Sequence, residues 1–295
     1  MNTITNTVEI SPKTSLTAVR VGIQGFSGAF HEIAARRFFG EQTIDIVPAH
    51  TFSELVEAIE KGESMDAGLM AIENTLAGSL MANYRLLLES KLKVSGEVFL
   101  RIQQNLLTLP GVRIEDLKEV HSHPVAIAQC RAFFSQYPNI QLVETYDTAL
   151  SARDVKENNW KHIGAIASGL AANLYDLEIC APAIETNKHN HTRFLILEKK
   201  EGAKAIKKAN KVSLSFTVDH EVGSLYKVLA VLAAYNVNLT KIQSAPIIGK
   251  PWEYRFFVDF VTKDLSWQQA IEAIRPITKE LIVLGAYPEG VKELS

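Results

Sequence analysis

The segment Val21–Ala35, VGIQGFSGAFHEIAA, indicates how the first part of the chain is built. Val19, Val21 and Ile23 alternate with other residues as in a β-strand. A glycine-containing turn follows, and then a helical pattern from about His31 to Phe39. Strand, turn and helix in this order open an α/β unit. The turn places backbone N–H groups at a helix N-terminus, which can bind an anion, but its G-x-x-G spacing suits an ordinary tight turn equally well.

This unit repeats up to about residue 175, with strands and helices in alternation. Such an order predicts sheets that are largely parallel and that bind ligands beyond the C-terminal ends of the strands. Five loops occupy these positions: 25–31, 73–79, 122–129, 147–148 and 168–169.

A second domain follows a lysine-rich segment. Residues 198–211 contain lysines at 199, 200, 204, 207, 208 and 211, and we interpret them as a solvated linker. Val212, Leu214 and Phe216 then alternate as in a half-buried strand, and the patterns that follow give the order β-α-β-β-α-β up to residue 287. A helix is expected at 266–281, bent or broken by Pro276, and the last strand at 282–287. This order is the ferredoxin-like split unit.

The composition excludes several classes of protein. The chain has 295 residues, 47% of them hydrophobic and 22% charged, which is typical of a folded globular protein. Its net charge of −2 gives no basis for general binding of nucleic acid. Cys130 and Cys180 are too few for a disulfide framework, and no apolar run reaches the roughly 18 residues of a membrane helix. Residues 1–18 lack the apolar core of a signal peptide, so we expect a cytoplasmic protein that binds no membrane.

Two groups of polar residues are candidates for a functional site, each with a plain structural alternative. In the run 190–194, Arg193 can bind a carboxylate with two parallel bonds and Thr192 can add a hydroxyl, or the pair is only the polar start of a strand. The run 73–75 is either a polar cluster at a strand end or a helix cap. The histidine pairs 121/123 and 189/191 lack other ligands at suitable spacing, so we expect no metal.

Together these segments resemble prephenate dehydratase with a C-terminal ACT domain, and the related arogenate dehydratase of plants. The resemblance covers about residues 18–290. It rests on these segments: Val21–Ala35, Ala71–Ser79, His121–Cys130, 147–149, Ala165–Ser168, Asn190–Phe194, 223–225, Asn238–Ile242, Tyr254–Phe260 and Val283–Pro288.

The resemblance implies an α/β fold: a bilobed catalytic domain similar to type 2 periplasmic binding proteins, and a ferredoxin-like βαββαβ ACT domain. The catalytic domain would span 18–198, with one lobe at 18–100 and 185–198 and the other at 101–184. A linker at 199–211 and an ACT domain at 212–290 would follow. The active site would lie between the lobes.

The resemblance also implies the reaction, in which prephenate loses carbon dioxide and water to give phenylpyruvate on the route to L-phenylalanine. No cofactor is needed, because aromatisation supplies the driving force. Thr192 matches the family's catalytic threonine and is expected to donate a hydrogen bond to the leaving oxygen or to relay a proton. Glu73 is either the acid or, as we favour, a structural partner. The expected catalytic residues are Thr192, Asn74, Gln129 and Glu73, and the expected substrate contacts are Arg193, Phe194, Thr75, Ser122, His123, Thr148, Ser168 and Gly28.

The ACT domain implies feedback inhibition by L-phenylalanine, bound between paired ACT domains of a homodimer or homotetramer. The expected contacts are Gly223, Ser224, Leu225, Asn238, Leu239, Gln243 and Ser244. The chain departs from the family here, because the usual Glu-Ser-Arg-Pro run reads Gln-Ser-Ala-Pro at 243–246. It departs also at Ala29, His31 and the run 76–78, where many relatives carry hydroxyl residues.

Two other functions stay open at this point. Arogenate dehydratase performs the same chemistry on a substrate with an ammonium group, and the motifs do not separate the two. A non-catalytic sensor would use the bilobed domain to bind a small molecule and the ACT domain to signal. The intact run 192–194 argues against a sensor.

Overall fold

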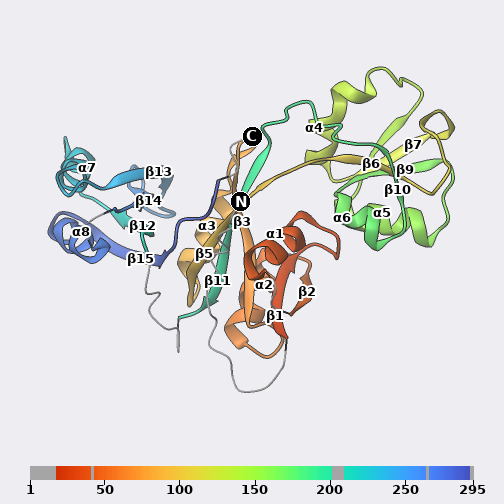
Figure 1. Cartoon of the computed structure of the whole chain (residues 1–295). Coiled ribbons are helices and arrows are strands. Elements are labelled where there is room, and N and C mark those ends of the chain that lie inside the picture. The colour runs from red at the N-terminus through yellow and green to blue at the C-terminus, as the bar shows by residue number, and fades with distance from the viewer. Residues whose placement is uncertain (1–17, 41–42, 201–208, 264–265, 293–295) are drawn as a thin grey trace.

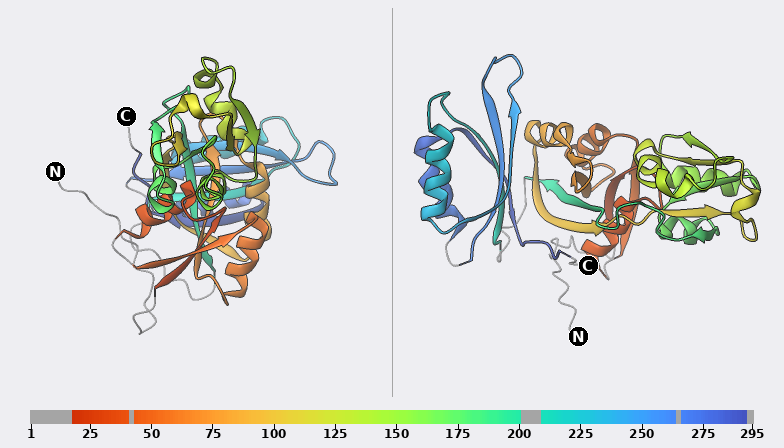
Figure 2. Two further views of the ribbon diagram at one scale, coloured as in Figure 1. Left: turned by 90° about the vertical axis from the view of Figure 1, so that its right-hand side faces the viewer. Right: turned by 90° about the horizontal axis from the view of Figure 1, so that it is seen from above.

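The computed structural model describes residues 18–40, 43–200, 209–263 and 266–292. They form three β-sheets with associated helices, and the first sheet lies between the other two (Figure 1 and Figure 2). The predicted fold class is confirmed: two α/β lobes are followed by a ferredoxin-like domain. The N-terminal tail and the middle of the predicted linker fall outside the described residues.

The first sheet has the strand order β2-β1-β3-β11-β5, and the short β4 pairs with β3. Strand β11 returns from the second lobe and inserts between β3 and β5, antiparallel to both. Residues of β11 alternate between the two faces: Phe194 and Ile196 pack with α1, whereas Leu195 and Leu197 pack with α2 and α3. The elements are β1 (Val19–Gln24), α1 (Phe30–Phe39), β2 (Ile44–Ala49), α2 (Phe52–Lys61), β3 (Ala67–Asn74), β4 (Gly78–Ser79), α3 (Met81–Glu89), β5 (Leu92–Arg101) and β11 (His191–Lys199).

The second sheet has the order β10-β6-β9-β7-β8. Strands β7, β8 and β9 are parallel, and the chain passes from each into a helix within a few residues, so that α4, α5 and α6 begin at the same edge. The elements are β6 (Asn105–Thr108), a 3-10 turn (Ile114–Asp116), β7 (Glu119–Ser122), α4 (Pro124–Phe134), β8 (Gln141–Glu144), α5 (Thr148–Glu157), β9 (Ile163–Ala167), α6 (Gly169–Leu174) and β10 (Glu178–Ala181).

The prediction of largely parallel sheets was wrong for five of the nine strand pairs in the described parts of the two lobes. Strands β1 to β3 and β7 to β9 are parallel, but β11 runs antiparallel to β3 and β5, and β6 runs antiparallel to β9 and β10. The chain crosses between the lobes twice, from β5 to β6 and from β10 to β11. The strands at these crossings run against the parallel βα units, which local sequence patterns do not reveal.

The third sheet has the order β13-β14-β12-β15, with all neighbours antiparallel, and α7 and α8 cover one face. Pro276 ends the second helix earlier than predicted: α8 stops at Ile274, and a 3-10 turn leads to a strand that starts at Lys279. The elements are β12 (Lys211–Thr217), α7 (Ser224–Ala234), β13 (Asn238–Pro246), β14 (Tyr254–Val261), α8 (Trp267–Ile274), the 3-10 turn (Arg275–Ile277) and β15 (Lys279–Tyr287).

The other face of the third sheet packs against the first lobe. Leu284 and Tyr287 share a hydrophobic core with Leu92 and Val94 of β5. A Cβ atom at Gly285 would overlap the backbone oxygen of Val94, so this close approach requires glycine. The ACT-type domain is therefore packed on the catalytic domain, not connected by the linker alone.

Lys211 corrects the prediction of a solvated linker at its last position. Its side chain is fully buried and is ion-paired with Glu97 of β5, at 2.8 Å. Burial and the nearby Arg193 lower its pKa, whereas Glu97 opposes that change. Composition alone could not distinguish this lysine from its neighbours, because its burial depends on the packing of the two domains.

Candidate active site at the junction of the lobes

Asn74, the last residue of β3, holds the hydroxyl of Thr192 on the neighbouring strand. Its Oδ1 accepts hydrogen bonds from the backbone N–H groups of Leu76 and Ala77, both at 2.9 Å. These two bonds fix the orientation of the amide, so Nδ2 faces β11 and donates to Thr192 Oγ1 at 3.0 Å. Since Thr192 Oγ1 accepts from Asn74, its own hydrogen is available for a bond to another group.

The same amide begins a chain of neutral side chains that joins the two lobes. Asn74 Nδ2 also donates to Asn190 Oδ1 at 2.7 Å, and Asn190 Nδ2 donates to Oε1 of Gln129 on α4 at 2.9 Å. Gln104 Nε2, from the first crossing segment, donates to the same Oε1 at 3.3 Å. We call Thr192, Asn74, Asn190, Gln129 and Gln104 the amide network.

The structure therefore brings three of the four predicted catalytic residues, Thr192, Asn74 and Gln129, into one network. It adds Asn190 and Gln104, which sequence reasoning did not select. Asn190 is fully buried and directly precedes the strand that carries Thr192. Its position in the run 190–194 could therefore have identified it from the sequence. Gln104 lies in no recognised motif, and only the path of the chain between the lobes places it here.

Two of the predicted hydroxyl contacts, Ser122 and Thr75, are bonded within the protein. Ser122 Oγ is fully buried and donates to the backbone oxygen of Ile166 at 2.6 Å. Thr75 Oγ1 donates to the oxygen of His189 at 2.8 Å and accepts from the N–H of His191 at 2.9 Å. These bonds fix the loops that carry the site. Thr148, another predicted contact, lies at the start of α5 and is half-buried.

The glycine-containing turn contacts the second lobe directly. Ser168 Oγ donates to the backbone oxygen of Gly28 at 2.6 Å, and a Cβ at Gly28 would stand 3.0 Å from the backbone of Ala171. Gly28 has a φ of +91°, which further favours glycine. The backbone N–H of Gly28 donates to the buried carboxylate of Glu32 at 2.8 Å, so this N–H is not available to bind an anion.

Arg193 lies on the opposite face of β11 from Thr192, because adjacent residues of a strand point to opposite faces. Its guanidinium is 3% exposed and is ion-paired with Glu97 at 2.7 Å and with Asp259 of β14, and it donates to the hydroxyl of Tyr287 at 3.0 Å. The structure thus places Arg193 between the catalytic domain and the third sheet, away from the amide network. This position corrects the prediction that it grips the substrate.

Glu73 shares this face, where its carboxylate is ion-paired with Arg193 at 3.4 Å and with Lys241 of β13. The contacts fit the structural role that we favoured for it and separate it from Thr192. Phe194 points back to the first face, but it is 1% exposed and lies in the core.

His31 packs beside the amide-network face. Its ring lies 4.9 Å from that of Phe194 and 5.6 Å from that of Phe52, measured between centroids. Burial lowers the pKa of His31 to about 4, so the imidazole is neutral near pH 7. Nε2 is buried without a hydrogen-bond partner among the described residues.

The N-termini of α4 and α5 lie at the edge of the second sheet where β7 and β8 end. His123 caps α4 by accepting from the N–H of Val125 at 3.2 Å, and Asp147 caps α5 by accepting from that of Leu150 at 2.9 Å. Burial raises the pKa of Asp147. Helix N-termini carry partial positive charge, so this edge suits a negatively charged ligand, most of all at α4, whose cap is not a carboxylate.

The predicted effector residues lie at several places on the third sheet. Gly223 has a φ of +80° and precedes α7, which begins with Ser224 and Leu225. Asn238 and Leu239 begin the edge strand β13, while Gln243 and Ser244 lie about 15 Å further along it at 3.3 Å per residue. One copy of the chain therefore does not gather them around a single small molecule.

Within the described ranges, no three His, Cys, Asp or Glu side chains lie close enough together to hold a metal ion. His121 instead bonds Glu119 at 2.8 Å. No helix in the described part of the chain has the length and apolar character needed to cross a membrane. A pocket of about 240 Å³ lies mainly on the Arg193 side; it is lined by Glu73, Asn74, Thr75, Gly78, Ser79, Phe99, His191 and Arg193.

Family models match two successive parts of the chain. The family model for prephenate dehydratase matches residues 21–202, and that for the ACT domain matches residues 212–277. A protein named arogenate dehydratase 2, from Petunia hybrida, is 37% identical over 286 residues, which cover 92% of this chain and 72% of that protein.

Two solved structures are similar over most of their length. One, described as GqqA, a novel type of quorum quenching acylase, has a TM-score of 0.81 and 31% identity, and the match covers 92% of this chain and 98% of that one. The other, prephenate dehydratase from Arthrobacter aurescens in complex with L-Phe, has a TM-score of 0.79 and 26% identity over 91% and 89% of the two chains. The chain belongs to the prephenate dehydratase family and carries an ACT domain after its dehydratase domain.

Proposed function

We propose that the chain catalyses the decarboxylating dehydration of prephenate to phenylpyruvate. The observation that carries this proposal is the bond from Asn74 Nδ2 to Thr192 Oγ1, which leaves the threonine hydrogen free to bond a leaving oxygen. In the reaction the bond between the ring and its carboxylate breaks, and carbon dioxide leaves. The electron pair enters the ring as the bond to the 4-hydroxyl breaks, and that oxygen takes up one proton to leave as water.

The amide network suits this chemistry because it is neutral and fixed in place. Thr192 donates to the oxygen on which negative charge develops, and preorganised donors of this kind stabilise a transition state without reorganisation. Gln129 Oε1 already accepts two bonds, so its Nε2 is a second donor. A threonine hydroxyl is too weakly acidic to be an ordinary general acid near neutral pH, so it holds the oxygen or relays a proton.

The substrate is a dianion, and the proposed receptors for its charge are the N-termini of α4 and α5 at the second lobe. They replace Arg193 in this role, since its guanidinium is saturated by Glu97, Asp259 and Tyr287. His123 and Thr148 belong to these two N-termini and stay predicted substrate contacts.

The direct test is to incubate the purified chain with prephenate and, separately, with arogenate, and to identify the products by chromatography. Phenylpyruvate from prephenate supports the proposal. Phenylalanine formed faster from arogenate assigns the alternative dehydratase instead. Failure to turn over either compound, with prephenate bound in calorimetry, would favour the non-catalytic sensor. Acylase activity is measured on the same preparation, because the structure described as an acylase resembles nearly the whole chain.

We further propose feedback inhibition by L-phenylalanine in a cytoplasmic homodimer or homotetramer. The separation of the predicted effector residues along β13 supports a site shared between copies. Exposed apolar residues lie on this edge strand, on the turn after it and at the start of β14: Ile242, Ile248, Trp252 and Tyr254. Analytical sedimentation tests the assembly. Calorimetric titration tests the effector site, and the absence of binding heat at about millimolar phenylalanine would count against it. A Kd near 1 mM corresponds to a binding free energy of only about 4 kcal/mol.

A further inference from the structure

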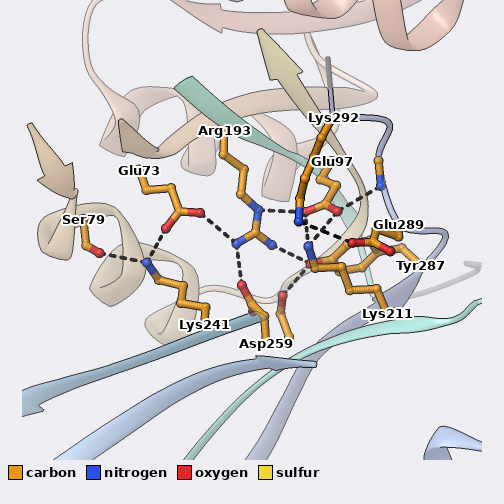
Figure 3. A network of polar contacts seen from close by, with 12 residues as sticks. Glu73, Ser79, Glu97, Arg193, Lys211, Lys241, Asp259, Tyr287, Glu289 and Lys292 are labelled. Carbon is orange, nitrogen blue, oxygen red and sulfur yellow. Dashed lines mark hydrogen bonds and ion pairs between the residues drawn. The ribbon is translucent and has the colours of Figure 1, made fainter. Parts of the chain in front are cut away.

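An ionic cluster joins the catalytic domain to every strand of the ACT sheet (Figure 3). From the catalytic domain come Glu73 on β3, Arg193 on β11 and Glu97 on β5. They face Lys241 on β13, Asp259 on β14, Lys211 on β12 and Tyr287 on β15. We call these seven residues the interdomain cluster; its three acidic and three basic side chains balance.

One pair in this cluster lies directly behind the amide network. Lys241 Nζ donates to the carboxylate of Glu73 and to Ser79 Oγ, the latter at 2.8 Å, and lies 5.4 Å from the ring of Tyr84. Glu73 and Ser79 form a backbone pair between β3 and β4, and Asn74 is the next residue of β3. The lysine thus clamps the short β3–β4 hairpin from which Asn74 reaches Thr192.

Two irregularities in strand pairing direct these side chains to each other. On β13 the register shifts between Leu239 and Lys241. As a result Leu239 packs toward the helices of the ACT domain, whereas Lys241 points to the catalytic domain. On β3 the register against β11 shifts next to Glu73, which places Ile72 and Glu73 on the same side. Bulges commonly re-aim a side chain in this way.

The Lys241–Glu73 pair is also the most accessible ion pair between the domains in the cluster. The side chain of Glu73 is 30% exposed, whereas those of Glu97 and Asp259 are 0% and 4% exposed. Lys241 lies on the edge strand, which among the described strands pairs with β14 alone, and the same strand carries four of the predicted effector residues. A shift of β13 would therefore change this pair before it disturbs the buried ones.

We propose that Lys241 is a positioning residue for the reaction: from the ACT domain it fixes Glu73, and through the β3–β4 hairpin it fixes Asn74 against Thr192. The pair thereby links the edge strand of the ACT sheet to the amide network. This inference rests on the proposed dehydratase function. It goes beyond that function because it assigns a residue of the regulatory domain a part in basal turnover.

The test compares Lys241→Met with wild type in the full chain, using prephenate. Loss of the clamp misplaces Asn74 slightly, so kcat should fall about tenfold. KM should stay within about twofold, because the substrate contacts are untouched. Lys241→Arg should keep most of the activity. Lys250→Met, at an exposed lysine of the β13–β14 turn, is the matched control and should behave as wild type.

A charge reversal separates positioning from general damage. Glu73→Lys alone should lower kcat, and the double variant Glu73→Lys with Lys241→Glu should recover at least part of the loss, as residues in direct contact do. In Lys241→Met, calorimetry should still detect L-phenylalanine while the fraction of activity that it inhibits falls. A kcat within twofold of wild type in Lys241→Met, or a double variant no better than Glu73→Lys, overturns the inference. If wild type itself does not convert prephenate, it is the proposed function that fails.

Discussion

The two faces of strand β11 hold their side chains by different kinds of interaction. On one face Thr192 joins a network of neutral amides, and on the other Arg193 joins a buried cluster of ions. These residues are neighbours in the sequence and point to opposite faces of the strand. The comparison shows that a short motif can supply one residue to the chemistry and the next to the packing of domains.

The difference has a physical reason. A donor for a developing oxyanion must be uncommitted, and the neutral network leaves the hydrogen of Thr192 free. A guanidinium between two domains must instead be fully paired, because an unpaired buried charge is strongly destabilising. Each prediction below removes or alters a group on one face and asks whether the effect appears in turnover or in stability.

The largest expected effect is on stability and comes from Arg193→Met. The variant leaves Asp259 buried without its cation and removes one of the two cations paired with Glu97, so the free energy of unfolding should fall by about 3–5 kcal/mol. Urea unfolding followed by circular dichroism measures the change. Arg275→Met, which breaks an exposed pair with Glu272, is the control and should cost less than about 1 kcal/mol. Equal, small losses in the two variants would show that the cluster does not hold the domains.

On the other face, Thr192→Ala should lower kcat about 100- to 1000-fold, the loss typical of one donor to an oxyanion. The unfolding midpoint should change little, because Asn74 keeps its bonds to Asn190 and to the backbone of His191. Steady-state kinetics and thermal unfolding give the two values. Thr192→Ser retains the hydroxyl and should retain most of the activity. Turnover like that of wild type in Thr192→Ala would remove the residue from the mechanism.

The sequence was sufficient for the fold class and for part of the amide face. Strand and helix periodicity, together with the family resemblance, gave the α/β units and the ferredoxin-like domain. Thr192, Asn74 and Gln129 each lie in a quoted segment that ends or follows a strand, and the structure joins them in one network, while their catalytic roles stay a prediction. The antiparallel insertion of β11 was not predictable from local patterns, since it depends on where the chain returns from the second lobe.

The ionic face shows why the remaining residues were misjudged. Arg193 resembles an anion-binding arginine by residue type, and Lys211 resembles a linker lysine by composition. Their burial depends on Asp259 and Glu97, which are distant in sequence and carry no motif. The register shifts that direct Glu73 and Lys241 are likewise a property of strand pairing. Residue type predicts what a side chain can bind, but not which face receives it.

The third prediction concerns pH and tests whether His31, beside the amide-network face, is held uncharged in the folded chain. His31 packs there against Phe194, with a pKa lowered by burial from 6.5 to about 4. As pH falls from 6.5, the unfolded chain takes up the proton and the folded chain does not, so stability is complete above about pH 6.5 and declines until about pH 4. The loss reaches about 3 kcal/mol at 1.36 kcal/mol per pKa unit.

Urea unfolding at a series of pH values measures this loss. His31→Gln cannot take up the proton, so its stability should decline less over the same range, although other groups still titrate. His220→Gln, at an exposed position, is the control and should follow wild type. An identical pH dependence in His31→Gln and wild type would show that His31 is not buried in its neutral form.

The smallest expected effect tests the link between the lobes and distinguishes a hydrogen bond from a charge. Asn190→Ala removes the connection from Asn74 to Gln129 but leaves the bond from Asn74 to Thr192, so kcat/KM should fall about tenfold, or about 1.4 kcal/mol. Asn190→Asp keeps an acceptor for Asn74, yet it adds a negative charge beside a site for a dianion. If neutrality is what the face supplies, Asn190→Asp should be the less active variant although it is closer in shape to wild type. An Asn190→Asp enzyme more active than Asn190→Ala would mean that the network acts through its geometry alone, and the contrast between the two faces of β11 would then be one of position and not of charge.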